Sequence, residues 1–203
     1  MKPTLAVDLD GTLVSCAPRH SALMRHVCRG DGLAADFIPH YWAAKREGAS
    51  NLVALRELGH PAPSARAAAW GRDIEHWPWL GFDRLLPGVV EALVTRRHRV
   101  VVLTARREPV FARQQLDRLG LARWVDDVIV VPPTAAAEAK ARHLQALRPI
   151  AFIGDAETDA AAGQAAGTPF IALNCGMRSA AFWQRQGRAS FPDLKAALAA
   201  LPS

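Results

Sequence analysis

Five short apolar runs, rich in β-branched residues, constrain the fold of this chain more than any other feature. They are Thr4–Asp8, Val100–Thr104, Val128–Val131, Ile150–Ile153 and Phe170–Leu173. Helical patterns separate the last four runs, over Pro109–Leu119, Ala135–Leu147 and Thr158–Ala166. Strands that alternate with helices of this length are typical of βαβ units and of a parallel sheet. The sequence therefore predicts an α/β fold, closed by a helix over Phe191–Leu201.

The stretch between the first two strands differs from the rest of the chain. It has no convincing strand, and its helical segments are expected over Arg19–Arg29, Phe37–Glu47, Leu52–Leu58 and Ser64–His76. At about 70 residues it is too long for a simple crossover. Leu86-Pro87-Gly88 marks the return, and Val89–Arg97 is the helix that leads into the second strand. We therefore expect a helical subdomain over residues 16–86, inserted into a core of residues 1–15 and 87–203.

Composition and charge argue against several classes of protein. No apolar run reaches the roughly 18 residues that a membrane span needs, and the N-terminus carries no signal-peptide pattern. The three cysteines form no CxxC motif, so a reduced, cytoplasmic setting is expected. The net charge is +6, but the basic residues are scattered and aromatic residues do not alternate with them. This argues against nucleic-acid binding, and affinity for anionic small molecules explains the charge equally well.

The first strand runs directly into two aspartates, Asp8 and Asp10, which a Gly-Thr turn follows. Residues i and i+2 of a strand point to the same face. The two carboxylates therefore share one site at the carboxyl end of the strand, where open α/β sheets bind ligands. Because close carboxylates repel each other, we expect a divalent cation or a raised pKa at this site.

Other polar residues fall at the same edge of the predicted sheet. The second strand ends at Thr104, and the fourth strand runs into Asp155 and Asp159, which share a face if a helical turn starts at Asp155. Lys140 is the only lysine between the second and fourth strands. Each of these residues also has an ordinary structural explanation, but their order and shared edge together indicate a catalytic site.

In this order and at this spacing, the residues resemble the four motifs of the haloacid dehalogenase (HAD) superfamily. The segment Asp8-Leu9-Asp10-Gly11-Thr12-Leu13 resembles motif I, Thr104 motif II, Lys140 motif III, and residues 154–159 motif IV. The resemblance covers the whole chain, because the helical insert lies where type-1 caps lie. It implies a doubly wound parallel sheet of strand order 5-4-1-2-3, with the ligand site at the switch point between strands one and four.

The resemblance also implies a role for each residue. Asp8 would attack phosphorus to form an aspartyl-phosphate, while Thr104 and Lys140 hold the transferring phosphoryl oxygens. Asp10 would protonate the leaving alkoxide and then activate water.

The implied cofactor is Mg²⁺. Its ligands would be Asp8, the backbone carbonyl of Asp10, and Asp155, with waters completing the shell. Asp159 would support the ion or orient Lys140.

An aspartate two residues after the nucleophile resembles the phosphatase and phosphomutase branches of this superfamily. We therefore expect a Mg²⁺-dependent phosphatase that acts on a small phosphorylated metabolite: a sugar phosphate, a phosphoglycolate-like acid or a nucleotide monophosphate. A phosphomutase with the same residues, and a binding module that has lost turnover, remain open. Phosphonate hydrolysis would need a cap lysine, for which Lys45 is the one candidate.

The cap would supply substrate specificity. Arg46 and Asn51 are our candidates for substrate contacts, although the aromatic and basic residues around them also suit a cap core and a solvated face. Ala105 and Arg106 follow Thr104 and are placed at the phosphate rim, where Arg106 would bind a second anionic group or pair with Glu108. The substrate's identity and the oligomeric state are left open by the sequence.

Overall fold

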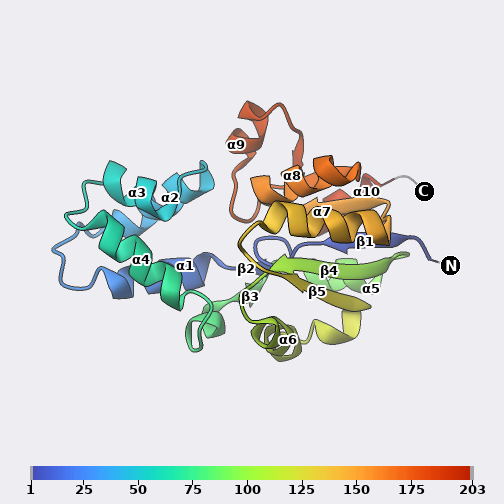
Figure 1. Cartoon of the computed structure of the whole chain (residues 1–203), viewed down its shortest axis with the longest axis horizontal. Coiled ribbons are helices and arrows are strands. Elements are labelled where there is room, and N and C mark those ends of the chain that lie inside the picture. The colour runs from blue at the N-terminus through green and yellow to red at the C-terminus, as the bar shows by residue number, and fades with distance from the viewer. Residues whose placement is uncertain (1, 202–203) are drawn as a thin grey trace.

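A computed structural model describes residues 2–201, which form a parallel sheet between two layers of helices, with a group of helices at one end (Figure 1). The outermost positions of the predicted core, residues 1, 202 and 203, lie outside the described part. The sheet contains β1 (Thr4–Val7), β4 (Arg99–Ala105), β5 (Asp127–Val131), β6 (Ala151–Gly154), β7 (Phe170–Leu173) and β8 (Ser190–Phe191).

The strand order is β5-β4-β1-β6-β7-β8, and all neighbouring strands are parallel. Over the five predicted strands this is the expected 5-4-1-2-3 order. The sixth strand, β8, extends the edge beside β7 and was not expected. The α/β prediction is thus confirmed, with one added strand.

The end of the chain differs from the predicted closing helix. Ser190–Phe191 pairs with β7 as a strand, and the carbonyl of Phe191 accepts a hydrogen bond from Asn174 at 2.9 Å. The helix α10 (Leu194–Ala199) begins only after Asp193, whose side chain accepts a hydrogen bond from the backbone N–H of Ala196. This N-cap starts the helix three residues later than the predicted Phe191.

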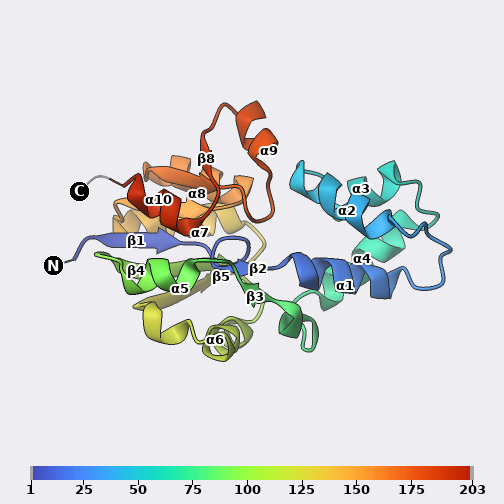
Figure 2. The same cartoon turned by 180° about the vertical axis from the view of Figure 1, so that it is seen from behind.

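Helices cover both faces of the sheet. On one face lie α7 (Ala136–Leu147) and α8 (Glu157–Ala166), which pack with Ala6, Leu103 and Phe152 (Figure 1). The opposite face packs against α5 (Val89–Val94), α6 (Pro109–Arg118) and α10, and Figure 2 shows α5 and α10 on its near side. Helix α5 ends three residues before the predicted Arg97, where the hydroxyl of Thr95 donates to the carbonyl of Glu91 at 2.9 Å.

The insert between β1 and β4 is mostly helical and buries its own apolar cluster. Its helices are α1 (Ala17–Val27), α2 (Phe37–Arg46), α3 (Asn51–Glu57), α4 (Pro63–Asp73) and the 3₁₀ turn η1 (Trp79–Phe82). Leu23, Met24, Tyr41 and Leu55 lie at the centre of this cluster. The expectation of no strand here was wrong at one point, because β3 (Arg84–Leu85) pairs antiparallel with β2 (Val14–Ser15). The two segments that connect the insert to the sheet are therefore hydrogen-bonded to each other.

Two short elements complete the fold: the 3₁₀ turn η2 (Ala122–Trp124) and the helix α9 (Ala180–Arg185), which the sequence analysis missed. The side chain of Ser179 caps α9 by accepting a hydrogen bond from the backbone N–H of Phe182. Helix α9 lies on the side of the core that faces α2 (Figure 1). Within residues 2–201, no helix is both long enough and apolar enough to cross a membrane.

Candidate active site

A small cavity of about 130 Å³ lies at the carboxyl ends of β1, β4 and β6. These strands are neighbours in the sheet, so residues far apart in the chain meet at this edge. The cavity is lined by Asp8, Asp10, Thr104, Ala105, Lys140, Asp155, Ala156, Thr158, Asp159 and Met177. All six residues predicted to be catalytic or to bind metal are among them. Ala105, one of the predicted substrate contacts, is there too.

Lys140 joins two of the carboxylates. Its ammonium group, on α7, donates to Asp8 Oδ1 at 2.7 Å and to Asp159 Oδ1 at 2.6 Å. All three side chains are buried. Burial would lower the pKa of Lys140, but the charges of Asp159 and Asp8 outweigh it and raise the pKa. Lys140 is therefore a permanent cation beside the predicted nucleophile.

Burial and the charge of Lys140 have opposite effects on the pKa of Asp8. Burial raises the pKa of this carboxyl to about 7 and outweighs the opposing effect of Lys140, while Asp159 raises the pKa further. A nucleophilic carboxylate has to be ionised. The site would hold Asp8 ionised more firmly if a further cation lay beside it.

Asp155 is the carboxylate in this cluster that pairs with no cation in the described part of the chain. Its Oδ2 atom accepts a hydrogen bond from the backbone N–H of Met177, but its buried Oδ1 atom has no partner among the described residues. Burial raises its pKa, and the charges of Asp8 and Asp159 raise it further. Ligand atoms of the three aspartates lie within 4.8 Å of one another. Carboxylate oxygens are the ligands that a hard divalent cation such as Mg²⁺ prefers, and a buried oxygen without a hydrogen-bond partner is available to bind one.

Backbone packs closely around Asp155. A Cβ atom placed on Gly11 would lie 1.7 Å from Asp155 Oδ2, and one placed on Gly176 would lie 2.1 Å from the same atom. Gly11 also has φ +76°, a conformation that residues with side chains rarely adopt. Only glycine at these two positions leaves the carboxylate in its observed place.

Asp10 is held by two arginines. Arg19 Nη2 donates to Asp10 Oδ1 at 2.8 Å, and Arg106 Nη2 donates to the same oxygen at 2.7 Å. Burial would raise the pKa of Asp10, but the charges of Arg106 and Arg19 outweigh it and lower the pKa to about 2. Asp10 is therefore ionised in this structure. Arg106 pairs with Asp10 rather than with Glu108, the other partner considered for it.

The geometry can be compared with known proteins. The model of the haloacid dehalogenase-like hydrolase family matches residues 3–167. The chain belongs to this family. Phosphoglycolate phosphatase of Rhodobacter capsulatus is 27% identical over 208 residues, which are 97% of this chain and 95% of that protein.

Solved structures show the same HAD fold. A haloacid dehalogenase-like family hydrolase from Streptococcus pneumoniae superposes with a TM-score of 0.68 at 17% identity, over 91% of this chain and 90% of the other. A predicted phosphoglycolate phosphatase from Haemophilus somnus superposes with a TM-score of 0.65 at 19% identity, over 96% and 95%. The family match, together with these relatives, supports a phosphoric monoester hydrolase.

Two predicted substrate contacts lie in the cap of this HAD protein and have other partners. The guanidinium of Arg46 donates to the backbone carbonyls of Asn174 and, at 3.3 Å, of Arg178. The side-chain oxygen of Asn51 accepts a hydrogen bond from the hydroxyl of Tyr41 at 2.8 Å. Their role in substrate binding stays a prediction.

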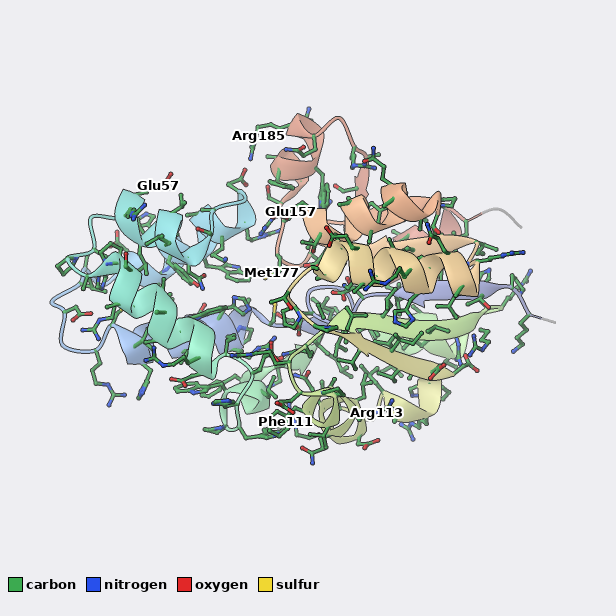
Figure 3. All side chains as sticks on the ribbon, viewed as in Figure 1. Glu57, Phe111, Arg113, Glu157, Met177 and Arg185 are labelled. Carbon is green, nitrogen blue, oxygen red and sulfur yellow. The ribbon has the colours of Figure 1, made fainter. Side chains whose placement is uncertain are left out.

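The cap is fastened to the loop that follows β7. Arg178 donates twice to Glu157, at 2.6 Å each, and once to the backbone carbonyl of Lys45 at 2.8 Å. Arg185 on α9 forms an ion pair with Glu47 at 2.5 Å. Figure 3 shows Met177, Glu157 and Arg185 on the side of the core that faces the cap helices. No motif in the sequence pointed to Arg178, because its partners are distant along the chain.

Lys45 and His20 are buried near this contact. Lys45 forms no ion pair among the described residues, and the buried Nδ1 atom of His20 has no hydrogen-bond partner there. Burial lowers the pKa of Lys45 to about 8, and the charge of Arg178 lowers it further. The pKa of His20 is lowered by burial and by Arg19, so its ring is neutral between Trp42 and Trp70.

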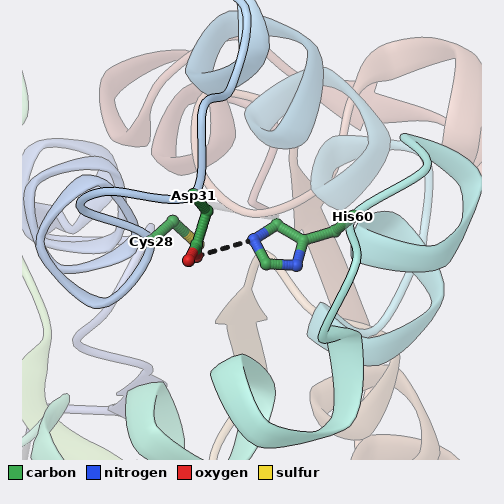
Figure 4. A group of neighbouring side chains, drawn as sticks. All are labelled: Cys28, Asp31 and His60. Carbon is green, nitrogen blue, oxygen red and sulfur yellow. Dashed lines mark hydrogen bonds and ion pairs between the residues drawn. The ribbon is translucent and has the colours of Figure 1, made fainter.

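A second cluster of possible metal ligands lies inside the cap (Figure 4). It contains Cys28, Asp31 and His60. Arg66 occupies both oxygens of Asp31, at 2.8 and 2.5 Å. The Nδ1 atom of His60 accepts from the backbone N–H of Ala62, so Nε2 carries the proton and donates to Asp31 at 3.1 Å. The third member, Cys28, donates from Sγ to Met24 Sδ at 3.5 Å. Because all three residues have other partners, we interpret this cluster as structural.

Proposed function

We propose that this HAD protein is a Mg²⁺-dependent phosphatase that hydrolyses a small phosphorylated metabolite through an aspartyl-phosphate on Asp8. The observation that carries the proposal is the buried cluster at the cavity floor. There Asp8 lies 2.7 Å from the ammonium of Lys140, and Asp155 Oδ1 has no partner among the described residues. Phosphoryl transfer to a carboxylate needs a nucleophile, a cation for the phosphoryl group and an acidic side chain that can bind a metal ion.

In the first step, Asp8 attacks phosphorus, and the bond between phosphorus and the ester oxygen breaks. Lys140 and the hydroxyl of Thr104, both at the cavity wall, hold the transferring phosphoryl oxygens. Their positions are fixed before substrate binds, because Lys140 is buried between two carboxylates and Thr104 ends the buried strand β4. Preorganised donors of this kind stabilise charge in the transition state.

Asp8, Asp155 and the backbone carbonyl of Asp10 would hold Mg²⁺. The bound ion would neutralise charge on the transferring phosphoryl group. Asp159, which contacts Lys140 at 2.6 Å, orients that lysine.

Asp10 moves the protons. It gives a proton to the leaving alkoxide in the first step and takes one from the attacking water in the second, when the bond between Asp8 and phosphorus is hydrolysed. Asp10 is ionised in this structure, so the first proton has to come with the substrate. Phosphate monoesters have a second pKa near 6, so a fraction of the substrate carries that proton at neutral pH.

A small phosphorylated acid is the substrate class that the surroundings favour. Lys45 is buried on the cap side of the site and forms no ion pair among the described residues, so a carboxylate on the substrate would offset its charge. The Rhodobacter capsulatus relative is named a phosphoglycolate phosphatase, which supports phosphoglycolate as the first candidate.

The deciding experiment is hydrolysis of p-nitrophenyl phosphate and phosphoglycolate by the wild type and by Asp8→Asn, each with and without Mg²⁺. We expect Mg²⁺-dependent phosphate release that disappears in the variant. Turnover by Asp8→Asn would refute the proposed nucleophile. Trapping of a phosphoenzyme without phosphate release would instead favour the phosphomutase, and no reaction with any ester would favour a silent binding module.

A further inference from the structure

Asp10 belongs to a closed ring of five side chains, here called the Asp10 ring: Asp10, Arg19, Asp83, Gln115 and Arg106. From Asp10, the ring runs through Arg19, which donates at 2.8 Å, to Asp83, whose Oδ1 atom lies 3.2 Å from Arg19 Nε. This link is an ion pair without hydrogen-bond geometry, because neither atom has a hydrogen-bond partner among the described residues. Asp83 accepts from Gln115 at 2.5 Å, Gln115 accepts from Arg106 at 3.1 Å, and Arg106 donates back to Asp10 at 2.7 Å. Asp10 faces the cavity, and the other four side chains are at most 4% exposed.

The ring ties together parts of the fold that are distant along the chain. Arg19 lies on α1, the first cap helix, and Asp83 lies just before β3, where the chain returns to the core. Gln115 lies on α6, and Arg106 follows β4. Both passages between cap and core are thus connected to the loop that carries the acid–base aspartate.

The residue types in the ring obey a strict count of donors and acceptors. The two arginines can only donate, so Asp83 and Gln115 must each offer an acceptor to an arginine. In the contact between Asp83 and Gln115, one side chain must also donate a hydrogen bond and the other must accept it. One carboxylate and one amide meet these conditions. Two amides would leave two donors facing each other whichever way they are flipped. Two carboxylates would leave two acceptors in contact for as long as both are ionised, and a proton shared between them would restore the donor. A buried network in which some polar groups lack a hydrogen-bond partner destabilises the folded protein.

We propose that Asp83 and Gln115 are positioning residues which, through Arg19 and Arg106, hold the Asp10 carboxylate where it exchanges a proton with the leaving oxygen. This rests on the function proposed above. Neither residue lines the cavity, so each acts only through its arginine. Proton transfer depends steeply on placement, because the donor must come within hydrogen-bond distance of the leaving atom.

The donor count supplies a test by rescue. Asp83→Asn breaks the count at any pH, and Gln115→Glu breaks it where both carboxyls are ionised, so the rates are compared across a range of alkaline pH. The double variant Asp83→Asn/Gln115→Glu restores a donor facing an acceptor between residues 83 and 115 and keeps the total charge. First-turnover release of the alcohol would be measured for two esters. These are p-nitrophenyl phosphate, whose leaving group departs without a proton, and the best alkyl phosphate of a metabolite panel that includes phosphoglycolate.

We expect each single variant to lose about tenfold or more in rate on the alkyl ester relative to the aryl ester, a loss typical of general acid catalysis. The double variant should recover most of that ratio. Asp126→Asn is the matched control, because it weakens an arginine–aspartate pair at the opposite end of β4. Thermal melts would establish that each variant folds, and Gln115→Met, which removes the polar group without a clash, is the second variant if a single charge change prevents folding.

Three results would overturn the proposal: an equal loss on both esters, no loss on either ester, or a double variant no better than the singles. Equal losses would assign the ring to stability alone. The function proposed above is tested separately by Asp8→Asn on the aryl ester, so its failure is distinguishable from failure of the ring. If wild-type protein turned over neither ester, both would fall.

Discussion

Lys140 Nζ lies 2.7 Å from Asp8 Oδ1 and 2.6 Å from Asp159, so one cation serves two of the three buried aspartates. Asp155, the third, forms no ion pair within residues 2–201. When all are ionised, three carboxylates against one ammonium leave a charge of −2 in a buried site, which one divalent cation would neutralise. A bound divalent cation, as proposed above, would balance the charge of the cluster with all three carboxylates ionised.

Replacing Lys140 by methionine should remove most of the activity. The variant keeps the volume of the side chain but leaves Asp8 and Asp159 without their cation and the phosphoryl oxygens without a donor. We expect kcat to fall on the order of 10²–10³-fold, measured by steady-state hydrolysis of an aryl phosphate. Lys195→Met, on the exposed face of α10, is the control and should behave as wild type. A Lys140→Met enzyme within a few-fold of wild type would contradict the proposed role.

Gly176→Ala should abolish Mg²⁺ binding. Its Cβ atom would come 2.1 Å from Asp155 Oδ2 and 2.3 Å from the carbonyl oxygen of Gly11, so the carboxylate and the backbone after Asp10 cannot both keep their places. The matched control is Gly71→Ala in α4, where a Cβ meets no atom within 4 Å and the helix should gain about 0.5–1 kcal/mol. Calorimetric titration with Mg²⁺ distinguishes the two variants. Normal Mg²⁺ affinity in Gly176→Ala would show that Asp155 is not a ligand.

The sheet and the cavity residues were predictable because they depend on local patterns. Apolar runs end in polar residues, and parallel strands bring those ends to one edge. Asp8, Thr104 and Asp155 all reach the cavity for this reason. A short strand such as β8 has too little pattern to be recognised, and Asp193 determines where the last helix begins only through its capping hydrogen bond.

Contacts between the cap and the core could not be predicted in the same way. Asp83 and Gln115 are 32 positions apart and have no motif, yet their side chains meet at 2.5 Å. Arg106 was considered with its near neighbour Glu108, but burial places it on Asp10 and Gln115 instead. Such partners are decided by how the insert folds back on the sheet, which single-sequence patterns do not encode.

Arg46→Ala should loosen the end of α2 before any substrate is present. The guanidinium binds two backbone carbonyls in the loop after β7, so its loss frees the contact between this loop and the cap. Hydrogen exchange of the substrate-free protein should show faster exchange in α2 and around Ser179, whose N–H bonds the carbonyl of Arg46. Arg56→Ala, on an exposed position of α3, serves as the control. Unchanged exchange in α2, with a raised KM, would mean that Arg46 contacts substrate instead.

Lys45→Met should stabilise the substrate-free protein, and the gain should depend on pH. Burial lowers the pKa of Lys45 to about 8 from 10.5, and Arg178 lowers it further. Below pH 8 the lysine is protonated in both states, and the folded state bears the full cost of the buried charge. Between pH 8 and 10.5 the unfolded chain binds more protons, so the stability of the wild type rises with pH and the difference disappears.

We therefore expect Lys45→Met to unfold with a free energy up to about 3 kcal/mol higher than wild type at pH 7 and nearly equal to it at pH 10.5. Urea denaturation at the two pH values measures this, with Lys195→Met as the exposed control.

A buried lysine that destabilises the folded protein is expected where its charge is needed to bind substrate. The same variant should therefore lose more kcat/KM on phosphoglycolate than on p-nitrophenyl phosphate. A variant less stable than wild type at pH 7 would show that Lys45 has a partner in the folded protein. Equal losses of kcat/KM on both esters would show that Lys45 does not bind the carboxylate of the substrate.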